Sequence, residues 1–346
     1  MSTTLITGGA GFVATNLARR LLDEGQRVRV LDDLSRMGVE ENLCWLSRRA
    51  GERLDVVIGD VCDEDTVSSA IAGVDAVFHL AAQVAVTTSL LEPMRDLETN
   101  LLGTVNVLEQ ARTRSRPPTV VFTSTNKVYG ALPDVELRSL DGRYAPVDER
   151  LRARGVSERR PLSFCTPYGC SKGAADQYVC DWAGSFSVPS VVFRMSCIYG
   201  PHQFGTEDQG WVAHFVNRLL ADQPITIYGD GGQVRDILYV DDLVQALTLA
   251  ATHAPRLAGR AFNIGGGPDN AVSLRDVIAL ASALCDTSAR ASYEEWRTGD
   301  QRWYVSDTAA FRRATGWRPR TAPREGLAAL RDWLAGAPVA EAITVR

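Results

Sequence analysis

Short apolar segments with the length of β-strands alternate with helical segments along the first 194 residues of the chain. The expected strands are residues 3–7, 28–32, 56–59, 76–80, 120–123 and 190–194, and the expected helices include residues 12–24, 66–72 and 94–112. Strands that are joined by helices run parallel, and a parallel sheet carries helices on both faces. The alternation therefore predicts an α/β protein built on a doubly wound parallel sheet.

The second half of the chain has a different pattern. After about residue 194, glycine and proline interrupt the alternation, at residues 200–201, 229–232 and 265–268. We expect residues 1–193, with about 235–265, to form the sheet domain, and residues 194–234 and 266–335 to form a smaller α/β substrate domain. Residues 131–166 are polar and broken, which is typical of an inserted lid or binding loop. Residues 336–346 are expected to be a frayed tail.

Composition and charge exclude several classes of protein. A net charge of −5 gives no reason to expect a nucleic acid or an anionic membrane as partner. No run of about 18 apolar residues and no signal peptide is visible. The seven cysteines lack CxxC spacing, so we interpret them as reduced thiols of a cytoplasmic protein. No histidine falls in a metal-ligand pattern, and we expect no metal site.

A glycine-rich turn follows the first expected strand and opens the first expected helix. Gly8 and Gly11 permit a tight turn whose N–H groups, with the helix N-terminus, favour a pyrophosphate. Asp32 ends the next strand, where a carboxylate accepts bonds from the adenosine ribose and repels a 2′-phosphate. We therefore expect NAD as the cofactor, although Arg36 nearby could accommodate that phosphate. Asp60 and Val61 are expected to bracket the adenine.

The two lysines of the chain both lie in segments with the character of a catalytic site. Lys127 and Lys172 are the only lysines among 37 Lys and Arg residues. Lys172 follows Tyr168 by four residues, so the two side chains share one face of a helix. The ammonium is expected to lower the pKa of the tyrosine, making it a base for a sugar hydroxyl. Thr125 ends a strand and is expected to hydrogen-bond the same substrate oxygen.

In combination, these segments resemble the extended short-chain dehydrogenase/reductases that act on nucleotide sugars. TGGAGFV (7–13), DDLS (32–35), HLAAQ (79–83), the Thr125 segment, YxxxK (168–172) and VRDILYVDD (234–242) occur in that family's order. A finer resemblance, to the CDP-tyvelose (CDP-paratose) 2-epimerase subgroup, is carried by NLCWLS (42–47), STNKVYG (124–130), PYGCSKGAADQY (167–178) and DQGW (208–211). The resemblance implies a Rossmann-type fold.

The resemblance also implies roles for individual residues. Thr125, Tyr168 and Lys172 would form the catalytic set. The cofactor would contact Gly8, Gly11, Phe12, Val13, Asp32, Asp33, Ser35, Arg36, Asp60, Val61, Leu80, Ala81, Ala82, Gln83, Asn100, Thr123, Tyr168 and Lys172. The nucleotide sugar would contact Thr87, Thr125, Asn126, Lys127, Ser196, Cys197, Gln209, Trp211, Arg235 and Arg302. Arg235 and Arg302 are the candidates for its diphosphate, with Asp241 or Asp242 supporting Arg235.

The residues after Thr125 indicate the type of reaction. In the resembled family, dehydratases carry an Asp-Glu pair there, whereas this chain has Asn126 and Lys127, which cannot serve as that acid. Oxidation and re-reduction of one carbon need no second acid. We therefore expect an NAD-dependent epimerase acting at C2 of a CDP- or other NDP-hexose. A C4 epimerase and a non-catalytic NAD-binding scaffold remain alternatives, and family resemblance implies a homodimer.

Overall fold

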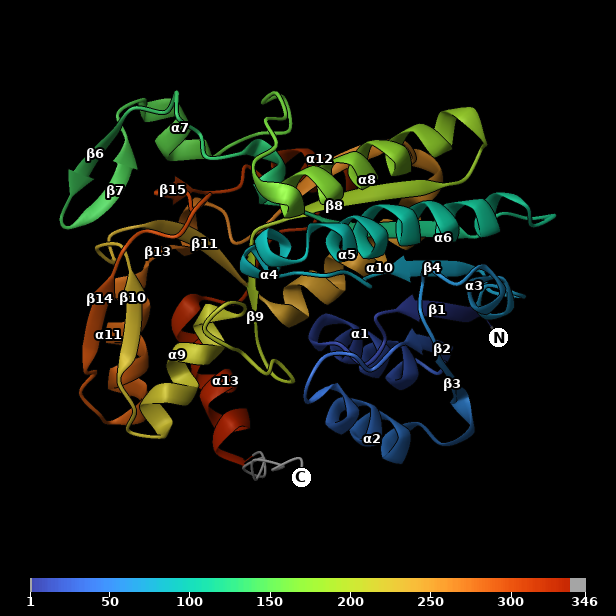
Figure 1. The fold of residues 1–346 in the computed structure, drawn as a ribbon, viewed down its shortest axis with the longest axis horizontal. Coiled ribbons are helices and arrows are strands. Elements are labelled where there is room, and N and C mark those ends of the chain that lie inside the picture. The colour runs from blue at the N-terminus through green and yellow to red at the C-terminus, as the bar shows by residue number, and fades with distance from the viewer. Residues whose placement is uncertain (1, 337–346) are drawn as a thin grey trace.

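The computed structural model describes residues 2–336, and its central feature is a sheet of seven parallel strands (Figure 1). Met1 and residues 337–346, which hold nearly all of the expected tail, lie outside the described residues. The strand order is β12-β8-β5-β4-β1-β2-β3. The strands are β1 (Thr3–Thr7), β2 (Arg27–Asp32), β3 (Leu54–Ile58), β4 (Ala76–His79), β5 (Thr119–Thr125), β8 (Ser190–Met195) and β12 (Arg260–Ile264). The predicted doubly wound α/β fold is confirmed.

Helices cover both faces of this sheet because its strands alternate buried side chains between them. Ile6, Phe78 and Val121 pack on one face, against α1 (Phe12–Asp23), α2 (Val39–Ala50), α10 (Val240–Leu257) and α12 (Ala309–Thr315). Their neighbours Leu5, Val77 and Val120 pack on the other face, against α3 (Glu64–Ala70), α6 (Gly103–Arg112) and α8 (Thr166–Ser185). Strands that are apolar on both faces account for the short continuous apolar runs of the sequence.

The helix expected over residues 94–112 is interrupted. It consists of α5 (Pro93–Leu97), a π-helical turn η2 (Glu98–Leu102) and α6, and is preceded by α4 (Val86–Leu91). The π turn places Asn100 in the interior, fully buried. Single π turns inside helices occur often at functional sites. Two short 3₁₀ helices, η1 (Gly51–Arg53) and η3 (Asn126–Tyr129), follow α2 and β5.

The later segments form a second layer of sheets and helices (Figure 1). β9 (Cys197–Tyr199), β13 (Ala271–Ser273) and β15 (Trp303–Tyr304) pair with β11 (Val234–Tyr239), and β10 (Ile225–Tyr228) pairs with β14 (Ala291–Glu294). α9 (Trp211–Leu220), α11 (Leu274–Cys285) and α13 (Pro323–Gly336) pack on them; η4 (Pro268–Asn270) precedes β13. The two-domain division remains a prediction. β11, which was expected in the sheet domain, pairs with strands of the second layer, and α12, which was expected in the substrate domain, packs on the central sheet.

The segment over residues 131–166 is not the broken loop expected from its polar sequence. It contains a hairpin, β6 (Leu137–Leu140) and β7 (Arg143–Pro146), and α7 (Glu149–Arg154), whose N-terminus is capped by Asp148. Its apolar residues Leu132 and Val156 pack against Trp303 and Tyr304, far along the chain. Within the described residues, none from 131 to 165 lines the main cavity. The expectation of a lid or binding loop was therefore wrong, because distant partners fold the segment away from the site.

None of the helices in the described part of the chain is long and apolar enough to cross a membrane.

Candidate active site

A cavity of about 940 Å³ lies at the carboxyl ends of the central strands. Gly8 follows β1, Asp32 ends β2, Leu80 follows β4 and Thr125 ends β5, and all four line it. Residues from the second layer, among them Cys197 and Gln209, close the other side. In doubly wound sheets this edge is where ligands bind.

The glycine turn fits a dinucleotide pyrophosphate. Gly8 has a φ of +65°, and a Cβ there would come within 2.8 Å of the Ala81 backbone. A Cβ at Gly11 would lie 3.1 Å from the carbonyl oxygen of Gly8. Gly11 is the N-cap of α1, so the unpaired N–H groups of a 12-residue helix begin at this turn. The N–H groups of Gly9, Ala10 and Gly11 are bonded within the protein, so the donors left for a ligand are those of the first turn of α1, with no glycine-turn side chain in front of them.

The adenosine side of the cavity holds the predicted carboxylate. One oxygen of Asp32 accepts from the N–H of Ala10 at 2.9 Å, and the other accepts from the N–H of Leu34 at 2.9 Å. Burial raises the pKa of this carboxyl, against the lowering effect of the two backbone bonds. Asp33 instead accepts from the N–H and hydroxyl of Ser35, which stabilises its own turn. The glycine turn and the end of β2 are thus joined into one rigid cradle.

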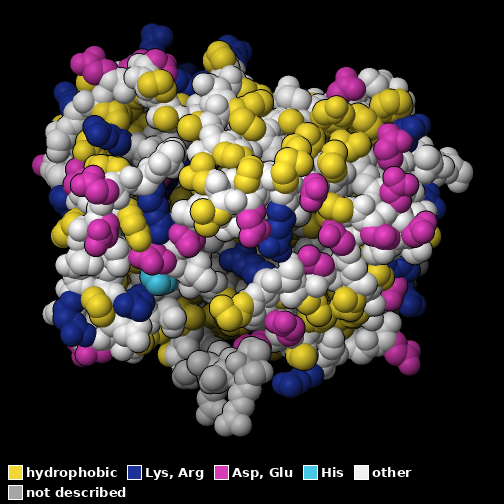
Figure 2. Space-filling view, viewed as in Figure 1, with side chains coloured by type: hydrophobic (Ala, Val, Ile, Leu, Met, Phe, Trp, Pro, Cys, Tyr) yellow, Lys and Arg dark blue, Asp and Glu magenta, His cyan; other side chains and the backbone are white. Residues whose placement is uncertain are grey.

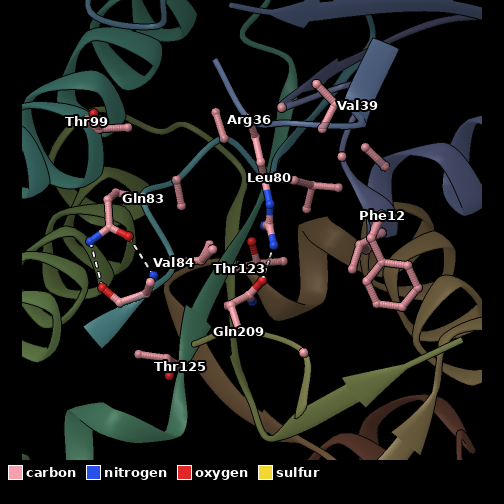
Figure 3. Close-up of a pocket in the computed structure, with 18 of the residues that line it drawn as sticks. Phe12, Arg36, Val39, Leu80, Gln83, Val84, Thr99, Thr123, Thr125 and Gln209 are labelled. Atoms are coloured by element: carbon pink, nitrogen blue, oxygen red, sulfur yellow. Dashed lines mark hydrogen bonds between the residues drawn. The ribbon is translucent and has the colours of Figure 1, made fainter. Parts of the chain in front are cut away.

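Thr125, Tyr168 and Lys172 meet in the same cavity, as predicted. Tyr168 lies in the first turn of α8 and Lys172 one turn later, and both are buried. The side chain of Thr125 lines the cavity beside Tyr168, and it opposes the effect of burial on the pKa of that tyrosine. The Lys172 ammonium lies 4.1 Å from the centre of the Phe122 ring, a cation–π contact. Figure 3 shows Thr125 at the end of its strand, facing the open cavity.

The pKa values of this group differ from the expected pattern. Burial raises the pKa of Tyr168 to about 12, and the nearby Asp96 adds to the shift. In the protein without its cofactor the expected lowering of this pKa does not occur, because burial outweighs the other influences; the lowering by Lys172 together with a cationic nicotinamide stays a prediction. Burial also lowers the pKa of Lys172 to about 7, despite the opposing influence of Asp176 and Asp96. Tyr168 is therefore neutral near neutral pH, whereas Lys172 is divided between its charged and neutral forms.

Asn126 and Lys127 line the cavity beside Thr125 and are held from the second layer. The Asn126 amide donates to the side-chain oxygen of Gln301 at 2.9 Å. The Lys127 ammonium lies 3.4 Å from Asp300, which also binds Arg235 at 2.6 Å. Burial opposes ionisation of Asp300, but Arg235 and Lys127 together hold the pKa of its carboxyl below the ordinary value. The carboxylate of Asp300 is therefore committed to two cations.

Of the predicted site residues, four do not line the cavity, whereas all the others do. Thr87 lies on α4, next to the lining residue Thr88, and Asn100 lies behind Gln83, whose carbonyl it contacts at 3.0 Å. Arg302 stacks over Tyr144 and Trp296, outside the cavity.

Arg235, the fourth, is paired with Asp300, so the predicted support from Asp241 or Asp242 was wrong. Asp241 pairs with Arg19 at 2.8 Å, and Asp242 accepts from the backbone of Arg320 and Thr321.

The substrate side combines small polar and aromatic residues. Trp211 donates its indole N–H to the sulfur of Cys197 at 3.5 Å, and Ser196 bonds the carboxylate of Asp236 at 2.5 Å. Gln209 accepts from Arg36 at 2.5 Å, and this bond crosses the cavity in Figure 3. The side chain of Gln83 donates to the carbonyl oxygen of Ala85 at 2.9 Å and accepts from the N–H of Ala85 at 2.5 Å (Figure 3).

A fully buried carboxylate behind the catalytic helix was missed by the sequence reasoning. Asp96 on α5 accepts from Ser171 at 2.5 Å, from Gln83 at 2.9 Å and from Asn100 at 3.1 Å. Burial raises the pKa of its carboxyl. Its spacing of four residues from Asn100 on a helical pattern was the available signal, and Ser171 immediately precedes Lys172. Asp96 thus connects the cofactor-side Gln83 to the catalytic helix.

His79, the last residue of β4, is a structural histidine. Its ring nitrogens contact Thr7 at 2.7 Å and Thr104 at 2.9 Å, and the side chain is buried. Burial, assisted by the charge of Lys172, lowers the pKa of His79 to about 3. In the unfolded chain the pKa is about 6.5.

A pH dependence of stability follows from His79. Below a pH of about 6.5 the His79 side chain binds a proton in the unfolded chain but stays neutral in the folded protein. As the pH drops below about 6.5, this site should therefore lower the free energy of unfolding by up to about 1.4 kcal/mol per pH unit. Above a pH of about 6.5 its contribution is constant. Urea unfolding between pH 7.5 and 5 should show a shallower dependence for His79→Gln than for wild type. The control His253→Gln, on α10, should keep the wild-type slope; equal slopes for all three would contradict this assignment.

Comparison with known proteins agrees with this site. The profile of the NAD dependent epimerase/dehydratase family matches residues 4–265. CDP-paratose 2-epimerase of Salmonella typhi is 40% identical over 336 residues, covering 95% of this chain and 98% of that relative. The UDP-glucose 4-epimerase of Thermotoga maritima, solved with UDP-glucose, superposes with a TM-score of 0.82 at 28% identity, covering 96% and 98% of the two chains.

A second solved structure carries the cofactor. The UDP-glucose 4-epimerase of Thermus thermophilus, solved with NAD, has a TM-score of 0.80 at 30% identity and covers 97% of this chain and 100% of that one. The cradle at Gly8, Gly11 and Asp32 fits the same cofactor. The protein is thus an NAD-dependent enzyme, and it belongs to the NAD dependent epimerase/dehydratase family.

Proposed function

We propose that this enzyme inverts C2 of a CDP-hexose, oxidising that carbon and reducing it again on the opposite face. The observation that carries the proposal is the meeting of Thr125, Tyr168 and Lys172 in one cavity with the cofactor cradle. The choice of C2 and of CDP rests on the similarity to CDP-paratose 2-epimerase, at 40% identity over nearly the full length of both chains.

Tyr168 is the group that exchanges a proton with the sugar. NAD, when bound, supplies the acceptor for the hydride that leaves the sugar carbon and the donor that returns it. The Tyr168 hydroxyl, beside Thr125 in the cavity, takes the proton of the sugar hydroxyl during oxidation and gives it back during reduction. Burial alone raises the pKa of this tyrosine to about 12, so positive charge near the ring is needed to make it an effective base at neutral pH. Lys172, one turn away, is placed to provide it.

The surroundings of Thr125 support inversion over elimination of water. Elimination needs a second acid next to the reacting carbons, but Asn126 and Lys127 occupy the positions after Thr125. Asp300 is engaged by Lys127 and Arg235, and these two cations hold the pKa of its carboxyl below the ordinary value in spite of burial. An ionised carboxylate cannot donate a proton. The site therefore offers Tyr168 as its proton donor and acceptor.

The keto-sugar has to stay bound while it turns over, and the cavity contains the cations for this. Besides Lys172, the cations that line it in the described chain are Arg36, Arg95 and Lys127. Of these, Lys127 lies on the side where the nucleotide sugar is expected and can attract its diphosphate, whereas Arg36 bonds Gln209 and Arg95 pairs with Glu92. Arg235 and Arg302 do not line the cavity. Lys127 is nearest to the catalytic group in sequence and lies two residues after Thr125.

The experiment mixes purified protein, without added cofactor, with CDP-, UDP-, GDP- and dTDP-hexoses and follows each sugar by NMR in D₂O. Inversion at C2 of a CDP-hexose without deuterium at the inverted carbon is expected, because the same hydride returns. Inversion at C4 would replace the proposal with the 4-epimerase function that the solved relatives carry in their names. Loss of water, or deuterium next to the inverted carbon, would contradict oxidation and re-reduction.

We propose further that two copies associate through the face formed by α4, α5, α6 and α8. Figure 2 shows hydrophobic side chains gathered over this face, and Leu91, Met94, Leu102 and Tyr178 are exposed there. Contiguous exposed apolar side chains of this kind mark interaction surfaces. Light scattering of the purified protein should give twice the chain mass of 37.7 kDa, and a monomer at micromolar concentration would refute the proposal.

The proposed compartment is the cytoplasm. The support comes from the cysteines: all seven are free thiols, and Cys44, Cys62 and Cys170 are exposed. Exposed thiols persist in a reducing compartment. Cell fractionation with an antibody against the protein tests this, and recovery with secreted material would refute it.

A further inference from the structure

The segment between β9 and α9, residues 201–209, is fastened along its length to the cofactor side of the cavity. We call it the strap. Its residues His202, Gln203, Phe204, Thr206, Asp208 and Gln209 all line the cavity. It belongs in sequence to the second layer, yet its bonds reach α1, α2 and the turn after β2. The strap therefore spans from the substrate side of the cavity to the cofactor side.

The first end of the strap is held by two buried asparagines. Asn16 on α1 donates to the carbonyl of Pro201 at 2.8 Å. Asn42 on α2 donates both to the carbonyl of His202 at 3.2 Å and to the carbonyl of Ala10, in the glycine turn, at 3.1 Å. The side-chain oxygen of Asn42 also contacts the His202 ring at 3.1 Å. One amide thus joins the strap directly to the turn that forms the pyrophosphate cradle.

His202 is held in an unusual conformation by these contacts. Its φ is +68°, a region that costs free energy for a residue with a side chain. Its ring packs against the rings of Trp45 of α2 and Trp333 of α13, with 4.3 Å and 5.3 Å between the ring centres. Burial lowers the pKa of His202 to about 4, so the ring is neutral at pH 7. The neutral His202 ring therefore fixes this end of the strap by packing between α2 and α13.

The middle and the far end of the strap close over the turn that follows Asp32 and Asp33. The Phe204 ring lies over Gly38, where an added Cβ would be 3.1 Å from the ring. Arg36 reaches across to Gln209 at 2.5 Å, and this bond bridges the cavity in Figure 3. In the described chain, Arg36 has no carboxylate within ion-pair distance, so the neutral amide of Gln209 is its main side-chain contact.

We propose that the strap is a retaining clasp that keeps NAD resident in the enzyme through many catalytic cycles. A dinucleotide held by the glycine turn and Asp32 lies behind the bonds that Asn16, Asn42 and Arg36 make to the strap and behind the packing of Phe204 on Gly38, and its exit requires these contacts to open. The inference rests on the proposed function, since inversion returns the hydride and the cofactor need not exchange. The nucleotide sugar, which must exchange every cycle, enters from the side of Lys127 and Trp211.

The test measures cofactor exit without any sugar. Protein loaded with isotopically labelled NAD is mixed with excess unlabelled NAD, and retained label is counted after rapid filtration at successive times. Phe204→Ala and Gln209→Ala should each release the label at least about tenfold faster than wild type, because such contacts act mainly on dissociation rates. The control Phe186→Ala, an exposed phenylalanine at the far end of α8, should release it at the wild-type rate.

The proposal would be overturned if the wild-type protein released the label as fast as Phe204→Ala or Gln209→Ala, with all three proteins folded by circular dichroism. Because label release involves no sugar, its outcome is independent of the nucleotide-sugar panel, and failure of the proposed function is distinguished from failure of the clasp.

Discussion

Tyr168→Phe should reduce turnover of the nucleotide sugar by about 10²- to 10⁴-fold, the range found when a general acid–base group is removed. In the proposed mechanism the hydroxyl of Tyr168 exchanges a proton with the sugar, and phenylalanine has no hydroxyl. Each factor of ten corresponds to about 1.4 kcal/mol of lost transition-state stabilisation. Because the ring remains, the packing of the first turn of α8 should be unchanged.

The measurement is kcat with the sugar identified by NMR, together with the NAD content of the purified variant. NAD should remain bound, since the cradle at Gly8 and Asp32 is untouched. Tyr178→Phe, an exposed change ten residues further along the same helix, is the matched control and should keep wild-type activity. A Tyr168→Phe enzyme with more than about a tenth of wild-type turnover would show that another group moves the proton.

Local motifs of the sequence were sufficient to predict the cofactor cradle and the catalytic group. The geometry of these sites is local. It follows from the turn at Gly8, the end of the strand at Asp32 and the one helix face that Tyr168 and Lys172 share. Parallel strands bring their carboxyl ends to one edge of the sheet, so the segments meet without any knowledge of distant contacts. The alternation of strands and helices predicted this sheet.

The differences between prediction and structure share a dependence on contacts between distant parts of the chain. The fold of residues 131–166 rests on Trp303 and Tyr304, which are buried with Val156. The partner of Arg235 is Asp300, 65 residues away, and not the neighbouring Asp241. The pKa of Tyr168 depends on how completely α8 is covered, which no local pattern reports. Position along the chain gave no signal for any of these three.

Asp176→Asn should lower the free energy of unfolding by about 3–5 kcal/mol, the range measured when one partner of a buried ion pair is removed. Asp176 on α8 binds Arg194 on β8 through two bonds of 2.8 Å each. The side chain of Asp176 is 0% exposed and that of Arg194 is 6% exposed. Asparagine keeps one acceptor oxygen, but it removes the negative charge and turns an NH₂ donor toward the guanidinium, which would remain buried beside the Tyr129 hydroxyl at 3.2 Å. Native proteins are stable by only about 5–15 kcal/mol, so this loss is large.

The cost should come from the unpaired charge and not from lost packing, and a double variant separates the two. Asp176→Leu combined with Arg194→Met replaces the pair with apolar side chains, and it should recover most of the stability, as other buried pairs do. Glu109→Gln, which breaks the exposed pair with Arg112, is the control and should cost less than about 1 kcal/mol. Urea unfolding of the four proteins at pH 7.5 measures these differences. If Asp176→Asn stays within about 1 kcal/mol of wild type, the pair is not what joins the catalytic helix to β8. If the single variant is unstable and the double variant is not, the cost comes from the uncompensated charge; if both are unstable, the pair itself is needed to join α8, which carries Tyr168 and Lys172, to β8.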